Sequence, residues 1–302
     1  MQRRNFLKHG ALLAGFPLLG TTAASAAAAA ASTAAVPSPA KIIGHTPLDA
    51  FRLGVAGYTF HKFKLDKTLE MLRSVDVHFL CIKDFHLPLK SSPEQIAAFH
   101  KKCATFGVTG YGVGPIYVGS EKALRESFDY AKRVGVKTLV GVPWKPAGKK
   151  RAASPELLKI ANELVQEYDI KYAIHNHGPD MPELFPNAQS GIELIANMDK
   201  RVGLCLDIGH ELRDGKDPVK ALLDYGDRIH DIHIKNVTAA TKAGKGIELP
   251  RGLIDFPALV RTLRKIGYTG VCSLEYEKDM GNPLLGIAES IGYFRGIADA
   301  TR

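Results

Sequence analysis

Imidazole and carboxylate side chains follow four successive apolar runs in the second half of the chain. The four segments are AIHNHG (173–178), LCLDIGH (204–210), IHIKN (232–236) and SLEYE (273–277). A polar group beside a buried run is costly unless something compensates it. The set His175, Asp207, His233 and Glu275 offers two nitrogen and two carboxylate ligands, which suit Mn²⁺, Co²⁺ or Zn²⁺ better than Mg²⁺ or Ca²⁺. The pattern predicts a divalent-metal site with Mn²⁺ as the favoured ion, and either His175 or His177 can supply the first ligand.

These residues need a scaffold that brings four chain segments to one place. Eight β-branched runs are expected as strands, at 52–56, 77–82, 108–112, 136–142, 170–175, 202–207, 229–235 and 271–275. Eight amphipathic stretches alternate with them, at 66–74, 93–106, 121–133, 155–168, 191–198, 218–225, 256–266 and 283–298. This alternation predicts a single (β/α)8 TIM barrel, whose chemistry lies at the carboxyl ends of the strands. A doubly wound open sheet is the alternative, but GVAGY after the first run lacks the GxGxxG spacing.

The barrel hypothesis assigns further polar residues to the same end of the molecule. Adjacent barrel strands lie ~4.8 Å apart, so neighbouring strand ends can each direct one ligand at a shared ion. The ends of the earlier strands would form the far wall of the cleft, with Lys83, His86 and Tyr117. Trp144, the only tryptophan, either stacks on a sugar ring or packs on the barrel rim. Lys83, His86 and Trp144 are therefore candidate substrate-binding residues.

The motifs resemble those of the xylose-isomerase-like TIM barrels, also called the sugar phosphate isomerase/epimerase family. DIGH (207–210) matches the D-x-G-H element of that family, HIKN (233–236) matches H-x-K-D with Asn236 in place of Asp, and Glu275 matches its last-strand glutamate. The resemblance runs from about Phe51 to the end of the chain. It implies a divalent metal held by the last four strands, with Glu275 as both ligand and base. It also implies that His210 contacts a substrate oxygen beside the reacting carbon.

The fifth strand departs from the family pattern. Epimerases and isomerases of the family usually have a glutamate there, as a ligand and second base, whereas this chain has His175 within HNHG. A histidine-rich fifth strand is more similar to the dehydratase members that act on keto-cyclitols. The second acid or base would then be His177, His210 or Lys235, and His177 is the expected catalytic partner of Glu275.

The expected function is therefore that of a metal-dependent sugar isomerase or epimerase, which acts through an enediolate on a free sugar or keto-sugar. The alternative is a keto-sugar or keto-glycoside dehydratase or lyase that uses the same metal site. A non-catalytic sugar-binding barrel is a more remote hypothesis. Zinc apurinic-site endonucleases share the barrel and the D-x-x-H element, but segment 238–245 lacks their additional histidine motif.

The amino-terminal segment is expected to be an export signal rather than part of the fold. MQRRNFLK (1–8) is followed by apolar GALLAGFPLLG, an alanine-rich tract and Ala-Ser-Ala at 24–26. The segment resembles a twin-arginine signal, which predicts a signal peptide and linker over 1–40, a catalytic domain over 41–302 and a periplasmic location. The partners expected are the twin-arginine translocase during export and a small sugar substrate.

The remaining composition argues against two other classes of partner. The formal net charge is +9, but the dense basic cluster at 145–151 has no interleaved aromatic residues to stack on bases, so nucleic acid is not expected. We expect that cluster to be a solvated loop. Outside the first thirty residues no apolar run approaches the ~20 residues of a membrane span, so none is expected in the mature protein. The four cysteines have no CxxC spacing and are expected to be buried thiols.

Overall fold

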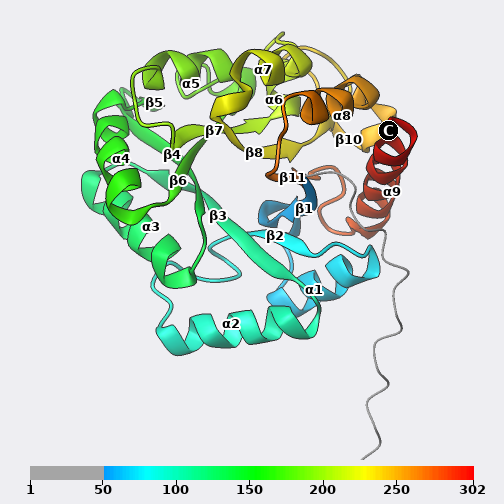
Figure 1. The fold of residues 1–302 in the computed structure, drawn as a ribbon, viewed down its shortest axis with the longest axis horizontal. Coiled ribbons are helices and arrows are strands. Elements are labelled where there is room, and N and C mark those ends of the chain that lie inside the picture. The colour runs from blue at the N-terminus through cyan, green and yellow to red at the C-terminus, as the bar shows by residue number, and fades with distance from the viewer. Residues whose placement is uncertain (1–50) are drawn as a thin grey trace, which may run out of the picture. The chain divides into compact units, whose positions relative to one another are not determined.

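A computed structural model describes residues 51–302, and eight of its strands form a closed parallel barrel (Figure 1). Their order around the barrel is β3-β2-β1-β11-β8-β7-β6-β4, and pairing between β3 and β4 closes it. The predicted (β/α)8 barrel is confirmed. The eight strands are β1 (Arg52–Ala56), β2 (Phe79–Ile82), β3 (Thr109–Val118), β4 (Thr138–Ala147), β6 (Lys171–His175), β7 (Val202–Asp207), β8 (Ile229–Ile234) and β11 (Val271–Leu274).

The helices lie outside the strands and cover the barrel (Figure 1). They are α1 (Leu65–Ser74), α2 (Pro93–Thr105), α3 (Glu121–Val134), α4 (Pro155–Tyr168), α5 (Ala188–Ile195), α6 (Ile208–Arg213), α7 (Pro218–Tyr225), α8 (Phe256–Lys265) and α9 (Leu284–Ala300). Local sequence sets several ends: the Ser92 hydroxyl caps α2 by accepting from the Gln95 amide, and Gly135 ends α3 in the left-handed region. Each strand of the barrel is thus followed by at least one covering helix.

Two barrel strands extend beyond their predicted ends. β3 continues to Val118 and β4 to Ala147, and a short strand, β5 (Lys150–Ala153), pairs antiparallel with the end of β4. Gly148 lies between them at a φ of +61°, a conformation that suits a tight hairpin. The basic cluster predicted to be a loop is therefore largely a β-hairpin. Its charges face solvent, where Lys145 pairs with Glu156 and Lys150 with Glu183.

Two further segments were not expected from the sequence. Helix α6 begins immediately after β7, because the side chain of Asp207 accepts from the backbone amide of His210 and caps it. A two-stranded ribbon of β9 (Asn236–Val237) and β10 (Gly246–Ile247) follows β8. Both segments lie at the carboxyl end of the barrel, where they extend the strand ends that bear the predicted ligands.

The core has an outer layer and an inner layer. Apolar side chains of strands and helices fill the space between the barrel and its helical cover, and a smaller cluster inside the barrel holds Cys81, Val140, Ala173 and Cys205. All four cysteines of the chain are buried, as predicted. Within residues 51–302, no helix is long and apolar enough to cross a membrane. The predicted signal peptide, residues 1–40, lies outside the described residues.

Candidate metal centre and active site

Strand register brings the four predicted ligands to one point at the carboxyl end of the barrel. His233 on β8 is in register with Asp207 on β7 and with Ser273 on β11, two residues before Glu275. His175 ends β6, the strand on the other side of β7. Ligand atoms of all four side chains lie within 4.8 Å of one another, and all four residues are buried.

The donor atoms converge closely enough to share one cation. His175 Nε2 lies 3.1 Å from His233 Nδ1 and 3.9 Å from a carboxylate oxygen of both Asp207 and Glu275. His233 Nδ1 lies 3.5 Å from Glu275 Oε2. Asp207 Oδ2 is buried, and among residues 51–302 it has an ion pair with Lys235 rather than a well-aligned hydrogen bond. Two imidazole nitrogens and two carboxylate oxygens in this arrangement fit a divalent transition-metal ion.

Of the two histidines on the fifth barrel strand, the structure brings His175 into the ligand group. The ring of His177 is adjacent, with its centroid 4.8 Å from that of His175, but its Nε2 lies 2.6 Å from Tyr117 Oη. His210 also lies at the cluster, with Nε2 3.9 Å from Asp207 Oδ2 and its ring stacked near that of His177. His177 and His210 are therefore neighbours of the ligand group rather than members of it.

Asp207 is held rigidly by its backbone. Asn176 makes reciprocal hydrogen bonds to it: the amide of Asp207 donates to Asn176 Oδ1 at 2.7 Å, and Asn176 Nδ2 donates to the Asp207 carbonyl at 3.1 Å. Burial raises the pKa of the Asp207 carboxyl to about 6, and the nearby Lys235 ammonium opposes that effect. These bonds fix the strand end, so one Asp207 oxygen caps α6 while the other faces the ligand group.

Lys235 contributes a positive charge to the centre. Its Nζ lies 2.9 Å from Glu275 Oε2, 3.1 Å from Asp207 Oδ2 and 2.6 Å from Glu277 Oε2. Burial works against the charged form, but Asp207 and Glu275 hold the pKa of Lys235 well above its ordinary value. Burial likewise disfavours charge on Glu275, yet Lys235 and His233 keep its pKa well below the usual range. Glu275 is thus a carboxylate at neutral pH, and a cation bound here would compete with Lys235 for the same oxygens.

Tyr117 and His177 form a neutral pair beside the ligands. Burial lowers the pKa of His177 to about 4 and raises that of Tyr117 to about 12. At neutral pH the pair therefore consists of an uncharged imidazole and an uncharged phenol. Tyr117 is 40% exposed, whereas His177 is buried. The sequence placed Tyr117 after a strand end, whereas it belongs to β3 itself.

The other predicted substrate-binding residues have their described contacts with residues outside the ligand group. Trp144 is on β4, and the guanidinium of Arg151 lies 4.5 Å from its ring centroid and 5.6 Å from that of Tyr117. Lys83 Nζ donates to the Pro115 carbonyl at 2.7 Å and pairs with Asp84.

His86 is buried, and its Nε2 lies 3.1 Å from Thr68 Oγ1 and 3.2 Å from the Phe63 carbonyl. Burial lowers the pKa of its imidazole to about 4, so His86 is neutral at physiological pH. Among the contacts described for residues 51–302, none joins Lys83 or His86 to the four ligands. These contacts give His86 a packing role between α1 and the loop after β2.

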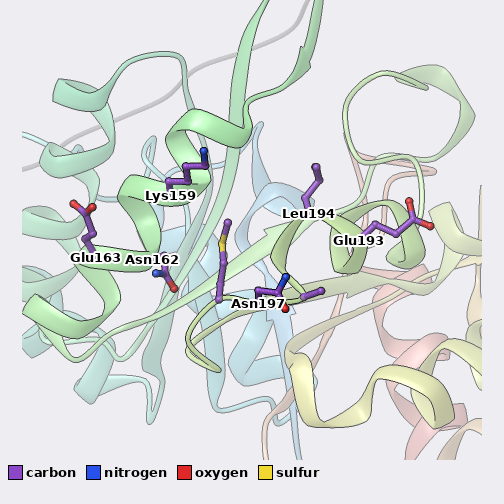
Figure 2. Close-up of a pocket in the computed structure, with 8 residues that line it drawn as sticks. Lys159, Asn162, Glu163, Glu193, Leu194 and Asn197 are labelled. Carbon is purple, nitrogen blue, oxygen red and sulfur yellow. The ribbon is translucent and has the colours of Figure 1, made fainter.

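A separate hollow on the outside of the barrel has a different chemistry. It has a volume of about 430 Å³ and is lined by residues of α4 and of α5 and its following turn, including Lys159, Asn162, Glu193 and Asn197 (Figure 2). No residue of the ligand group lines it. We therefore assign the chemistry to the buried strand-end cluster and not to this surface hollow.

Comparison with known proteins identifies the family. The family model for the xylose isomerase-like TIM barrel matches residues 68–297, so the chain belongs to that family. The structure of D-psicose 3-epimerase with D-tagatose from Clostridium cellulolyticum H10 is similar, with a TM-score of 0.66 and 16% identity over 82% of this chain and 99% of that one. This likeness supports the barrel fold.

Two curated relatives are similar over part of their length. The rhizopine catabolism protein MocC of Rhizobium meliloti is 30% identical over 156 residues, which are 47% of this chain and 45% of that protein. Inosose dehydratase of Lacticaseibacillus casei is 28% identical over 113 residues, which are 30% of this chain and 38% of that protein. The chain thus spans less than half the length of the relatives it matches.

Proposed function

We propose that this protein is a metal-dependent enzyme that removes a proton beside the carbonyl group of a free sugar or keto-sugar, and that a β-elimination follows. The observation that carries the proposal is the buried group of His175, Asp207, His233 and Glu275, with four donor atoms within 4.8 Å of one another. The curated relatives include a dehydratase, which agrees with an elimination. A dehydratase or lyase is thus favoured over the isomerase or epimerase expected from the sequence.

The first step needs a base and a means of stabilising negative charge. His175, Asp207, His233 and Glu275 would hold a divalent cation, which would supply Lewis-acid stabilisation of negative charge on the substrate. Glu275 turns Oε2 toward the ligand group, which leaves Oε1 to take the α-proton. Lys235, 2.9 Å from the same carboxylate, keeps it ionised before the step and is a hydrogen-bond donor for a substrate oxygen.

The second step distinguishes elimination from epimerisation. Epimerisation needs a second group that returns a proton to the same carbon on its opposite face, whereas elimination needs a proton for the departing oxygen. Tyr117 and His177 are both uncharged at neutral pH, and each carries a proton. Such a pair suits delivery of a proton to an oxygen that leaves the β-carbon. The electron pair of the enediolate then forms the new C=C bond as the β-C–O bond breaks. The leaving oxygen takes a proton from the Tyr117–His177 pair, and water or an alcohol departs.

The proposal is tested by metal analysis followed by a substrate screen. Wild-type protein should contain a divalent metal, and Asp207→Asn and His233→Ala should each lose most of it because each removes a ligand or a charge. The metal-loaded protein is then offered 3-keto-glycosides and simple ketoses in D₂O. An unsaturated or cleaved product with solvent deuterium exchange supports elimination, whereas an epimer or an aldose–ketose product would overturn it.

Two further results would contradict the metal site or the enzyme assignment. Full metal occupancy in both ligand variants would show that the cation binds outside the group of His175, Asp207, His233 and Glu275. Sugar binding without turnover of any compound in the screen would favour a non-catalytic sugar-binding barrel. His177→Ala is the matched variant for the second step: it should leave α-proton exchange detectable while it slows product formation.

A further inference from the structure

A second polar cluster lies inside the barrel, on the side of His233 that faces away from the other ligands. Asp231 precedes His233 by two residues on β8, so both side chains enter the barrel. Tyr111 Oη lies 3.0 Å from each oxygen of Asp231 and 2.6 Å from Ser273 Oγ. Tyr111 comes from β3, four places from β8 in the strand order, and therefore reaches across the barrel.

Asp231 is an unusual residue for this position. It is fully buried, and among residues 51–302 its ion-pair contact is with His233, whose Nε2 lies 3.8 Å from Asp231 Oδ2. A buried carboxylate without a compensating group is strongly unfavourable. Its oxygens accept hydrogen bonds from the Tyr111 phenol and, at 3.7 Å, from the Cys205 thiol. Side chains of β3 and β7 thus hold one carboxylate of β8 behind one imidazole.

The two nitrogens of His233 face different surroundings. Nδ1 faces His175 and Glu275, whereas Nε2 faces Asp231 and, among the described residues, has no hydrogen-bond partner. A neutral imidazole carries one proton, so Nδ1 can bind a cation only when Nε2 holds that proton. A buried N–H then needs an acceptor. The carboxylate of Asp231 is a strong acceptor beside Nε2, whereas the Cys81 and Cys205 thiols are weak ones.

We propose that Asp231 is a positioning residue of the metal centre. Its carboxylate accepts a hydrogen bond from Nε2–H of His233, which fixes the tautomer that leaves Nδ1 free for the cation. Tyr111, itself hydrogen-bonded to Ser273, holds the carboxylate in place. His233 Nε2 and Asp231 Oδ2 are 3.8 Å apart, so they must approach by about 1 Å to form a normal hydrogen bond. Asp231 makes no contact with the substrate in this arrangement. The inference rests on the proposed metal site and adds the residues that orient one of its ligands.

The first test measures Mn²⁺ affinity by competition with a chelator. Asp231→Asn should weaken binding ~10–100-fold, because an amide can present N–H to Nε2 and favour the wrong tautomer. Tyr111→Phe should weaken binding in the same direction by a smaller factor. Tyr130→Phe is the matched control, since that buried tyrosine donates to the Leu87 carbonyl, away from the site. It should leave the Mn²⁺ affinity unchanged.

A second measurement reads the tautomer directly. In the ¹⁵N NMR spectrum of the Zn²⁺-loaded wild-type protein, His233 should show a metal-bound Nδ1 and a protonated Nε2. Coordination through Nε2 would overturn the inference even if Asp231→Asn fails to fold. Thermal unfolding of each metal-free variant, compared with Tyr130→Phe, separates a loss of metal affinity from a loss of folded protein.

The outcomes separate this inference from the proposed function. If the wild-type protein binds Mn²⁺ and Asp231→Asn binds it with the same affinity, the role of Asp231 is refuted while the metal site stands. If the wild-type protein binds neither Mn²⁺ nor Zn²⁺, the metal site and the inference fall together. Weaker Mn²⁺ binding by Asp231→Asn, together with unchanged binding by Tyr130→Phe, supports both the metal site and the role of Asp231.

Discussion

Glu275 has two roles in the proposed chemistry, and one substitution separates them. Glu275→Gln keeps an oxygen ligand and the side-chain shape but removes the basic carboxylate. Metal should therefore be partly retained, while turnover falls by ~10²–10⁴-fold. Metal content and solvent exchange of the substrate α-proton are the two measurements. Exchange at the wild-type rate would mean that the base is another group, with Lys235 or His177 as the first candidates.

Glu211 predicts a pH dependence of stability next to the ligand group, where Asn176 Nδ2 donates to its carboxylate at 3.4 Å. Burial raises the pKa of its carboxyl to about 7, against the hydrogen bond that it accepts from the Ala188 amide at 2.7 Å. The folded state therefore binds more protons than the unfolded state between about pH 4.5 and 7, so the contribution of Glu211 to stability falls as pH rises through that window. The effect is on the order of 3 kcal/mol.

Glu211→Gln is the variant that tests this pH dependence. The glutamine keeps an acceptor for the Ala188 amide but cannot ionise, so the variant should gain stability relative to wild type as pH rises. Urea unfolding at pH 5 and pH 8 measures the difference between the two proteins. A constant difference between wild type and variant at both values would refute the assignment of the titrating group.

At the scale of elements, two glycines with open surroundings should respond in opposite ways to alanine. Gly135 ends α3 at a φ of +79°, where an alanine is strained, whereas Gly292 lies inside α9. Among the described residues, no atom lies within 4 Å of a Cβ added at either position. We expect Gly135→Ala to destabilise by ~1 kcal/mol and Gly292→Ala to stabilise by up to ~1 kcal/mol. Urea unfolding distinguishes the two signs, and equal effects would contradict the role of backbone conformation.

The elements also show which parts of the site could be predicted from sequence. The four ligands follow apolar strands directly, and in a parallel barrel that position alone fixes where a side chain lies. The sequence predicts Tyr117 beyond the end of the third strand, because Gly114-Pro115 resembles a strand end. In the structure β3 continues through Gly114-Pro115 and includes Tyr117. The contact of Tyr111 with Asp231 depends on register across the barrel, and local periodicity carries no information about that register.

At the scale of the whole molecule, the alternation of strands and helices predicted the barrel because each unit is local in sequence. The predicted export signal, residues 1–40, lies outside the described residues, so its role stays a prediction. We expect replacement of Arg3-Arg4 by two lysines to block export, since lysine does not reproduce the planar guanidinium pair. Fractionation of cells that express each form measures this. Normal periplasmic accumulation of the lysine form would show that the segment is not a twin-arginine signal.

The single tryptophan is an intrinsic fluorophore that lies next to Arg151. Trp144 is the only indole in the chain, and it lies on the β4–β5 hairpin beneath Arg151, whose guanidinium also approaches the ring of Tyr117. Tyr117 in turn contacts His177 next to the ligand group. Any ligand that displaces Arg151 or Tyr117 changes the polarity around one fluorophore. Intrinsic emission of the unlabelled protein would then report such a displacement without interference from a second tryptophan.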